Sequence, residues 1–412
     1  MNERKAPEIR FKGFTDDWEQ RKVGDTCKIN GRIGFRVYTE KDIISKEAGG
    51  VLTFSPTNIV DNKLTMDCKN TYITREKYDE SPEILIKNGD ILFVKTGSTL
   101  GKSALVTGLD EDASINPQIV VMRVEEGTEA FFSNVLITQD VLKQVTAVRI
   151  GGAVPTMTET ELKNFVYYEP TSKAEKNKIG EYFSNLDNLI TLHQRKHKKL
   201  LSVKKSMLEK MFPQNGAKVP EIRFEGFTDD WEQRKFSELY ARSSEKNDGS
   251  IGMDKNITVA TMQFKNDVKV STTEYLKTYY TFKLGDIAFE GHQSKEFRYG
   301  RFVENDIGNG IVSHIFAVFR PIQEYDLYFW KYAINNETLM QRILARSTKA
   351  STMMHDLVTN DFLNETFLVP SVKEQKQIGA FLNKLDNLIT LHQRELDKLV
   401  NIKKSMLEKM FV

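Results

Sequence analysis

Residues 95–103 read KTGSTLGKS, which is close to the phosphate-binding loop of nucleotide hydrolases. That loop follows the pattern G-x-x-x-x-G-K-[ST], because its backbone N–H groups curl around the phosphates while the Lys reaches over them. Here Lys102 and Ser103 follow Gly101 as the pattern requires, but three residues rather than four separate Gly97 from Gly101. The missing residue removes one peptide unit from the cradle. Whether this segment binds a nucleotide must therefore be judged from other features of the sequence.

Two further segments match catalytic motifs only in part. His193 and His197 would lie on one face of a helix, as in zinc proteases, but Gln194 stands where that motif needs Glu. Leu396 replaces the second His in a similar segment near the end of the chain, which favours a polar layer between helices over a metal site. Residues 116–119, NPQI, lack the second Pro and the aromatic residue of the N/D-P-P-Y loop of amino-methyltransferases. The sequence therefore predicts no catalytic residue and no metal site in this chain.

Composition narrows the class of protein. The 412 residues are enough for two or three domains, and 40% hydrophobic and 28% charged residues are ordinary for a soluble globular protein. The formal net charge is only +2, so a nucleic-acid surface would have to come from local basic patches. There is no apolar run of membrane-spanning length and no apolar signal core, and Cys27 and Cys68 belong to no motif. We therefore expect a cytoplasmic protein with inert, reduced thiols.

An internal repeat organises the chain. Residues 7–22 read PEIRFKGFTDDWEQRK and residues 220–235 read PEIRFEGFTDDWEQRK, so that only Lys12 and Glu225 differ. The sequence LDNLITLHQR occurs at 186–195 and 385–394, and KKSMLEKMF follows it at 204–212 and 403–411. The segments enclosed by these repeats are barely related to each other. The pattern indicates two common frames, each of which carries a different module.

Both frames end in a long segment typical of a coiled-coil helix. Residues 172–212 and 371–411 contain no proline and a single early glycine each. Their apolar residues follow the alternating spacing of a coiled-coil seam, as Ile179, Phe183 and Leu186 do in the first segment. At about 1.5 Å per residue each helix would be roughly 60 Å long, which a single small domain cannot bury. We expect the helices to pack on each other, and their basic middle parts to be solvated or, alternatively, to contact a partner protein or phosphate.

The segments inside the frames are typical of compact α+β modules. Short runs rich in β-branched residues, such as GVLTFSPTNIV and NITVATMQF, are broken by Gly, Pro, Asn and Asp, as strands with turns are. The two modules align on GDILF at 89–93 and GDIAF at 285–289. The loop that follows in the second module, EGHQSKEFRYGR, has no Gly-Lys-Ser/Thr. A shared position without shared chemistry favours a recognition loop over a nucleotide site.

These features together resemble one family, the specificity (S) subunits of type I restriction-modification enzymes. The resemblance covers essentially the whole chain and is carried by the two-half layout, by GDILFVKTGSTLGK and GDIAFEGH, and by the start of each long helix. In the second half that start consists of Pro370, Glu374, Gln375, Ile378 and LDNLIT. The first half matches it less fully, with Pro170, Glu175, Ile179 and LDNLIT.

The resemblance implies an α+β fold class, with two α/β target recognition domains separated by two long conserved helices that form an antiparallel coiled coil. It places the first target recognition domain at 1–171, the central helix at 172–213, the second target recognition domain at 214–370 and the distal helix at 371–412. In that family each target recognition domain reads one half of a bipartite, asymmetric DNA target. The helices space the half-sites and dock the methyltransferase (M) subunits.

The resemblance also implies that this chain is a non-catalytic subunit without a cofactor. Methylation by M subunits uses S-adenosylmethionine, and cleavage by restriction (R) subunits uses ATP and magnesium, so these cofactors belong to partner chains. The implied partners are double-stranded DNA, two M subunits for each S subunit, and R subunits, with no membrane. An alternative stays open, namely a non-catalytic coiled-coil scaffold that binds partner proteins or peptides. Near-neutral net charge favours the scaffold, whereas two unlike modules on equal frames weigh against it.

DNA-binding residues are expected in the loops of both modules. Base edges are read by Arg, Lys, Asn and Gln, while phosphates are bound by Lys, Arg and small hydroxyls. In the first module this chemistry favours Lys95, Thr96, Ser98, Thr99, Lys102, Asn116, Gln118 and Arg149. In the second module it favours Gln293, Ser294, Lys295, Arg298, Tyr299, Arg301, Ser313, His314 and Arg346. Each could alternatively be a solvated loop residue, so the loops are stronger predictions than the single side chains.

Overall fold

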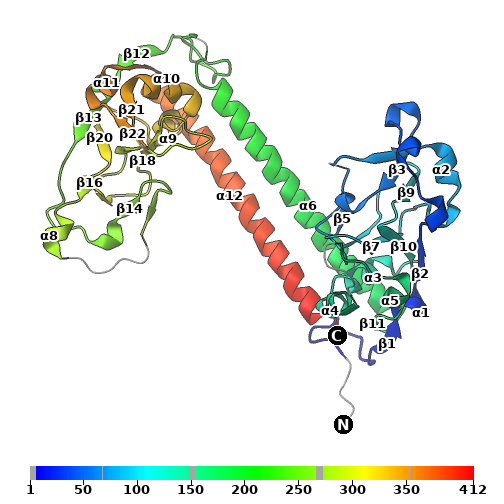
Figure 1. Ribbon diagram of the computed structural model, residues 1–412. Helices are drawn as coiled ribbons and strands as arrows, with labels where there is room; N and C mark the ends of the chain where they lie inside the picture. Colours follow the sequence, from blue (N-terminus) through cyan, green and yellow to red (C-terminus); the bar gives the residue numbers. More distant parts are fainter. Residues whose placement is uncertain (1–5, 67, 149–153, 215, 266–271, 352–353) are drawn as a thin grey trace. The chain divides into compact units, whose positions relative to one another are not determined.

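The chain divides into two compact units, each of which is described by itself. The computed structural model describes residues 6–66, 68–148, 154–214, 216–265, 272–351 and 354–412. Unit 1 comprises Met1–His193 and Glu395–Val412, and unit 2 comprises Gln194–Arg394. The long helices α6 (Lys173–Lys210) and α12 (Val372–Lys409) contribute to both units (Figure 1). The two long helices predicted from the apolar spacing are therefore present.

Unit 1 is built on a six-stranded sheet. Its order is β2 (Lys28–Gly31), β10 (Ile119–Arg123), β7 (Ile91–Val94), β8 (Ser103–Leu105), β5 (Lys63–Leu64) and β4 (Ile59–Val60). All residues of β7 are buried, since this strand lies inside the sheet and is covered on both faces. A second sheet has the order β6 (Thr71–Ile73), β3 (Val51–Phe54) and β9 (Ala113–Ile115), and β1 (Glu19–Lys22) pairs with β11 (Val166–Glu169).

Short helices connect and cover these strands. They are α1 (Val23–Thr26), α2 (Arg75–Asp79), α3 (Glu129–Val135), α4 (Gln139–Val148) and α5 (Glu159–Lys163). Single 3₁₀ turns lie at Gly34–Arg36, Glu40–Asp42, Lys46–Ala48, Pro56–Asn58 and Pro82–Ile84. Helix α5 begins where it does because Thr158 and Glu161 form a capping box, in which each side chain bonds the backbone N–H of the other.

Unit 2 repeats the central part of this arrangement. Its four-stranded sheet has the order β13 (Tyr240–Ser243), β20 (Ala317–Pro321), β17 (Ile287–Glu290) and β18 (Arg301–Glu304). The other strand pairs are β12 (Glu232–Lys235) with β23 (Thr366–Val369), β14 (Ile257–Thr258) with β15 (Gln263–Phe264), β16 (Tyr280–Phe282) with β19 (Gly310–Val312), and β21 (Thr348–Ala350) with β22 (His355–Leu357). The helices are α7 (Phe236–Leu239), α8 (Thr273–Leu276), α9 (Leu327–Ile334), α10 (Glu337–Ser347), α11 (Thr359–Asn364) and a 3₁₀ turn at Met253–Lys255. The order β13-β20-β17-β18 matches β2-β10-β7-β8 strand for strand.

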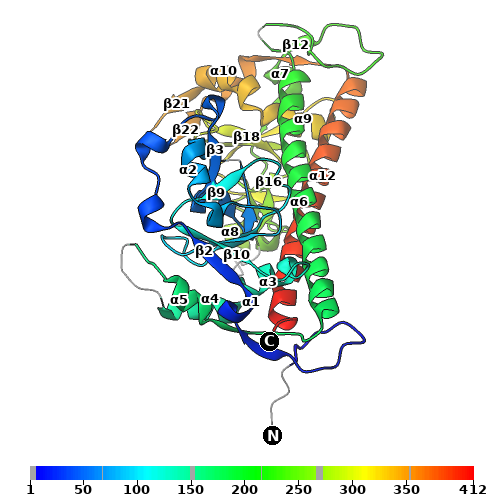
Figure 2. The ribbon, with the colours of Figure 1, turned by 90° about the vertical axis from the view of Figure 1, so that its right-hand side faces the viewer.

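The repeated sequences build the same aromatic core in both units. In unit 1 the ring of Phe411, at the end of α12, stacks on Phe131 of α3 at 5.6 Å and meets Trp18 edge-on at 6.2 Å. Figure 2 shows α3 beside the last turns of α12. In unit 2 Phe212 takes the same place against Phe329 at 5.6 Å and Trp231 at 6.1 Å. The identical KKSMLEKMF segments therefore close the two cores in the same way.

A glycine near the start of each long helix lets a second helix approach closely. A Cβ at Gly180 would lie 2.9 Å from the backbone nitrogen of Phe131, and one at Gly379 would lie 2.6 Å from that of Phe329. Both distances are shorter than real Cβ contacts, so a side chain at either position would push α3 or α9 away from the long helix. This explains why each otherwise helix-favouring segment carries one glycine.

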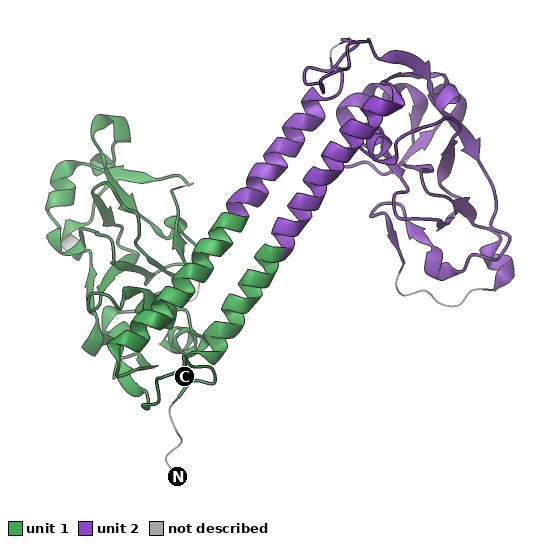
Figure 3. Cartoon of the chain, turned by 180° about the vertical axis from the view of Figure 1, so that it is seen from behind, with its two compact units in different colours: residues 1–193, 395–412 green, residues 194–394 purple. Residues whose placement is uncertain are grey.

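Segments of α6 and α12 also meet inside each unit (Figure 3). In unit 1 the Nζ atom of Lys403 lies 2.8 Å from the Asp187 carboxylate, and in unit 2 Lys204 lies 2.6 Å from Asp386. The α+β class predicted from the sequence is confirmed for both units, whereas the ranges assigned to target recognition domains stay a prediction. Among the described residues, no helix has an apolar stretch long enough to cross a membrane.

Candidate nucleic-acid interface

Three segments that are distant in sequence meet where strands of the unit 1 sheets end. Residues 95–102 follow β7, residues 116–118 follow β9, and residues 154–158 precede α5. The Lys95 N–H donates to the carbonyl of Gln118 at 2.8 Å, and the Lys95 carbonyl accepts from Met157 N–H at 2.9 Å. Gly97 N–H donates to the carbonyl of Pro155 at 2.8 Å. The backbone therefore joins these segments into one surface, which we call loop cluster 1.

Most of the residues predicted in the first module lie in loop cluster 1. The Lys95 ammonium pairs with Glu159 at 2.9 Å, and the hydroxyls of Thr96 and Thr156 are 2.9 Å apart. The Asn116 amide donates to the Gln118 side-chain oxygen at 3.1 Å. The remaining predicted residues of the loop comprise the exposed Ser98 and Lys102 and the half-buried Thr99. Arg149 lies outside the described residues.

Several backbone N–H groups of residues 95–102 are bonded within the loop. Gly97 and Gly101 have φ values of +110° and +90°, which only glycine adopts readily. The amide of Gly101 donates to the Val94 carbonyl at 3.0 Å, and that of Lys102 donates to Thr99 at 3.1 Å. These N–H groups are used inside the loop rather than turned toward a ligand. At these two positions the loop differs from a phosphate cradle, and the absence of a nucleotide site stays a prediction.

Unit 2 joins the equivalent three segments into loop cluster 2. Residues 291–300 follow β17, residues 313–316 follow β19, and residues 348–351 and 354–357 precede α11. The His355 N–H donates to the Gly291 carbonyl at 2.8 Å, and His292 forms an isolated bridge with Met354. The pairing of Phe289 with Ala317 brings the first two segments side by side.

The side chains of loop cluster 2 differ from those of loop cluster 1. Arg301 pairs with Glu290 at 2.8 Å and donates to the carbonyl of Ala260 at 2.7 Å. The Arg298 guanidinium lies 5.5 Å from the ring centre of Tyr299, whose ring packs edge-on against His355 at 5.4 Å. The remaining predicted residues of these segments comprise the exposed Gln293, Ser294, Lys295 and His314 and the half-buried Ser313.

The structure separates one predicted residue from these loops and adds others to them. Arg346 lies in α10 and pairs with Glu365, whose carbonyl accepts from Phe236 N–H at the start of α7. Sequence reasoning missed Ile315, which is 73% exposed beside the predicted His314. It also missed Thr156, because the segment before α5 carries no local motif and joins the cluster only through long-range backbone bonds.

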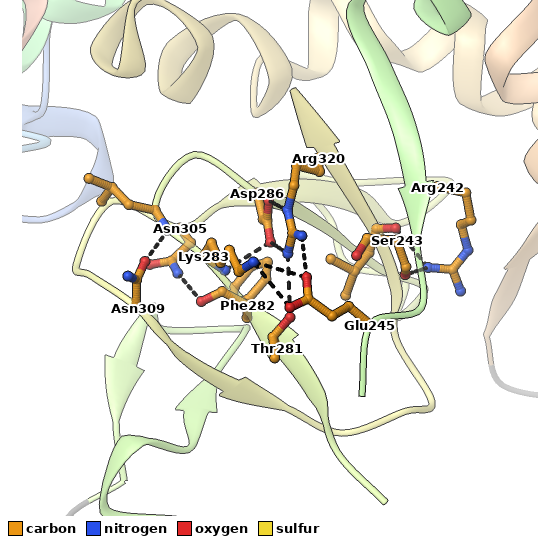
Figure 4. Close-up of polar contacts among 12 residues, drawn as sticks. Arg242, Ser243, Glu245, Thr281, Phe282, Lys283, Asp286, Asn305, Asn309 and Arg320 are labelled. Atoms are coloured by element: carbon orange, nitrogen blue, oxygen red, sulfur yellow. Dashed lines mark hydrogen bonds and ion pairs between the residues drawn. The ribbon is translucent and has the colours of Figure 1, made fainter. Parts of the chain in front are cut away.

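The Gly-Asp-Ile turns that align the modules are structural. Asp286 is fully buried, accepts from Lys283 N–H at 2.8 Å, and pairs with the Arg320 guanidinium at 2.9 Å (Figure 4). Hydrogen bonds from Arg320 and Lys283 lower the pKa of the neighbouring Glu245 to about 2. Asp90 makes the matching contacts in unit 1, with Lys87 N–H at 3.0 Å and Arg123 at 2.9 Å. Asp286 and Asp90 therefore stabilise the turns that lead into β17 and β7.

Cys27 is one of two free cysteines and is buried. Burial raises the pKa of Cys27 to about 12, so its thiol stays protonated and unreactive. Within the described part of the chain, no three His, Cys, Asp or Glu side chains gather closely enough to hold a metal ion.

Comparison with known proteins identifies the family. The family model for the type I restriction modification DNA specificity domain matches residues 15–202 and again residues 228–401. The crystal structure of an S subunit from M. genitalium is similar with a TM-score of 0.62 at 14% identity, over 99% of each chain. An HsdS subunit from Thermoanaerobacter tengcongensis is 16% identical over 96% of each chain, with a TM-score of 0.43. No curated protein matches. Because the family model matches twice and the two matches together cover most of the chain, this protein belongs to the type I restriction modification DNA specificity family.

Proposed function

We propose that this chain is the sequence-recognition subunit of a type I restriction-modification complex, and that each unit reads one half of a bipartite, asymmetric DNA target. The observation that carries this proposal is the loop cluster, built twice on near-identical frames with different side chains. The near-identical frames position the two loop clusters in the same way within their units. The different side chains of the two clusters give the units different sequence preferences.

The chemistry of the loop clusters suits DNA. Asn116 and Gln118 present amides that can bond donor and acceptor groups on base edges, and Ser98 and Lys102 can bind phosphates. In loop cluster 2, Gln293 and Arg298 are suited to base edges, and Lys295 is suited to phosphate. The predicted residues, Arg149 and Arg346 included, remain candidates until their contacts with DNA are measured.

The long helices would form the antiparallel coiled coil that spaces the two readers. In unit 1 the Asp187 carboxylate pairs with Lys403, while the ring centre of Phe183 lies 5.8 Å from that of Phe411. A lower residue number on α6 therefore meets a higher one on the α12 side, so the two segments are antiparallel. From Asp187 to Lys204 along α6, the partners on α12 run from Lys403 back to Asp386, which is the antiparallel order. The helices then also provide the surface on which M subunits dock.

Methylation and cleavage would take place in partner chains. Two M subunits with S-adenosylmethionine and R subunits with ATP and magnesium would assemble with this chain on double-stranded DNA in the cytoplasm. This chain would contribute binding and position only, since its acidic turns are occupied by structural ion pairs.

Methylome sequencing of a host that expresses this chain with its M subunits tests the proposal. We expect one methylated motif with two different half-sites and a fixed gap. If the chain is instead the scaffold considered above, methylation will not depend on it, and its removal will leave the methylome unchanged.

A further inference from the structure

An aspartate of the repeated LDNLIT segment has the same first partner in both units but a different second one. Asp187 pairs with Lys403 at 2.8 Å, and Asp386 pairs with Lys204 at 2.6 Å. In unit 2 the second partner is Tyr332 of α9, whose hydroxyl donates to Asp386 at 2.6 Å. In unit 1 the second partner comes instead from the strands that extend the main sheet beyond β8.

That partner is Lys63, the first residue of β5. Its ammonium donates to the Thr191 hydroxyl at 2.7 Å and to the Asp187 carbonyl at 3.0 Å, and it lies 3.4 Å from the Asp187 carboxylate. Its side chain is 35% exposed, so these contacts are partly shielded from water. Figure 1 shows β5 beside α6. We call this set of contacts the Lys63 brace.

The Lys63 brace is held rigidly on its module side. Asp61 and Asn62 have φ values of +51° and +59°, the left-handed pair that a tight two-residue hairpin between β4 and β5 requires. Lys63 also pairs with Leu105 of β8, the strand that leads directly out of residues 95–102. A short path of backbone pairing therefore connects α6 to loop cluster 1.

Unit 2 holds the equivalent loop in another way. Among its described residues, no strand pairs with the outer edge of β18. Arg301 of β18 instead donates to the Ala260 carbonyl, a contact within the module. In the part of the chain that the structure describes, the outer sheet edge is therefore tied to a long helix in unit 1 and not in unit 2.

We propose that Lys63 is a positioning residue, which fixes the angle of loop cluster 1 against α6 and so makes the complex selective for the length of the gap between half-sites. The inference rests on the proposed function. A module that can pivot on its helix tolerates a gap one base pair too long or too short, whereas a braced module does not. Base preference within each half-site depends on the loops and is independent of the brace.

The test measures binding of the complex of this chain with its M subunits to three duplexes. They carry the methylated motif with its natural gap and with the gap shortened or lengthened by one base pair. We expect Lys63→Ala to reduce the preference for the natural gap by about five- to tenfold, the effect of losing one ordinary hydrogen bond, because the Lys63 side chain is partly exposed to water. Methylome sequencing of the same variant should return unchanged half-sites.

One control and a second brace variant make the outcome decisive. Lys46→Ala removes an ion pair with Glu111 in the same module, away from α6, and should leave gap preference unchanged. Thr191→Val removes one acceptor but keeps the Lys403–Asp187 pair, and it answers the same question if Lys63→Ala lowers thermal stability. Unaltered gap preference in both brace variants, or a change of base preference, overturns the proposal. Failure of the unmodified complex to prefer any duplex would overturn the proposed function instead.

Discussion

In unit 1 the main sheet continues past β8 to β5 and β4, whereas among the described residues of unit 2 it ends at β18. Both sheets nevertheless begin on the same frame, with Trp18 and Trp231 in equivalent aromatic clusters. The difference indicates where the chain tolerates change. Residues of the repeated frame, such as Trp18 and Trp231, are the same in the two halves, whereas the outer sheet edge, the loops and the second partners of Asp187 and Asp386 differ.

Exchange of one module gives the largest expected effect. Replacing residues 236–370 with the matching segment of a relative should change one half-site completely and leave the other intact, because each loop cluster is closed within its own unit. Methylome sequencing of the hybrid reports both half-sites at once. A hybrid in which both half-sites change would show that the units do not read independently.

Removing a repeated core ring tests whether the two frames are equivalent. Phe411 is 9% exposed and Phe212 is 1% exposed, and both pack against the same kinds of ring. We expect Phe411→Ala and Phe212→Ala each to lower the free energy of unfolding of its own unit by about 3–5 kcal/mol. Urea denaturation followed by Trp fluorescence measures both. A loss confined to one variant would contradict the equivalence of the frames.

Much of the frame could be predicted from the sequence, and the reason is that its signals are local. The alternating spacing of apolar residues predicted both long helices, and the Gly-Asp-Ile match located equivalent turns in both modules. The third segment of each loop cluster could not be predicted, because Met157 and His355 join it through backbone bonds to distant residues.

Ion pairing of the candidate residues was equally hidden. Lys95, Arg301 and Arg346 each pair with a glutamate from another helix, strand or loop. Residue spacing in the sequence does not predict such a partner. The type of a basic residue can be predicted to suit DNA. Whether its charge is available depends on the folded neighbourhood.

A buried acid distinguishes the sheets in their response to pH. Glu304 of β18 is 3% exposed with no hydrogen-bond partner among the described residues, and burial raises its pKa well above the ordinary value. Leu105 occupies the equivalent place in β8, since it pairs with Ile91 as Glu304 pairs with Ile287. Unit 1 therefore lacks this titrating group.

The sign of the effect follows from proton binding. Above the unfolded pKa of about 4.3 the unfolded chain releases this proton while the folded chain keeps it. Unit 2 should therefore lose up to about 1.4 kcal/mol per pH unit until the folded pKa is reached. Glu304→Gln should remove that loss, so its stability advantage over the unmodified protein grows as pH rises from 5 to 8. Parallel pH dependence of the two proteins in urea denaturation would contradict this assignment.

The smallest expected effect separates available from neutralised charge in loop cluster 1. Lys102 is exposed and has no ion pair among the described residues, whereas Lys95 is paired with Glu159 at 2.9 Å. If Lys102 binds a phosphate, Lys102→Ala should reduce the slope of log affinity against log salt concentration by about 0.9. Lys95→Ala should reduce it less, because its charge is already offset, and Glu159→Gln should raise affinity for DNA of any sequence. Titration of the complex at several salt concentrations measures all three slopes. Equal losses for Lys102→Ala and Lys95→Ala would show that Glu159 releases Lys95 when DNA binds.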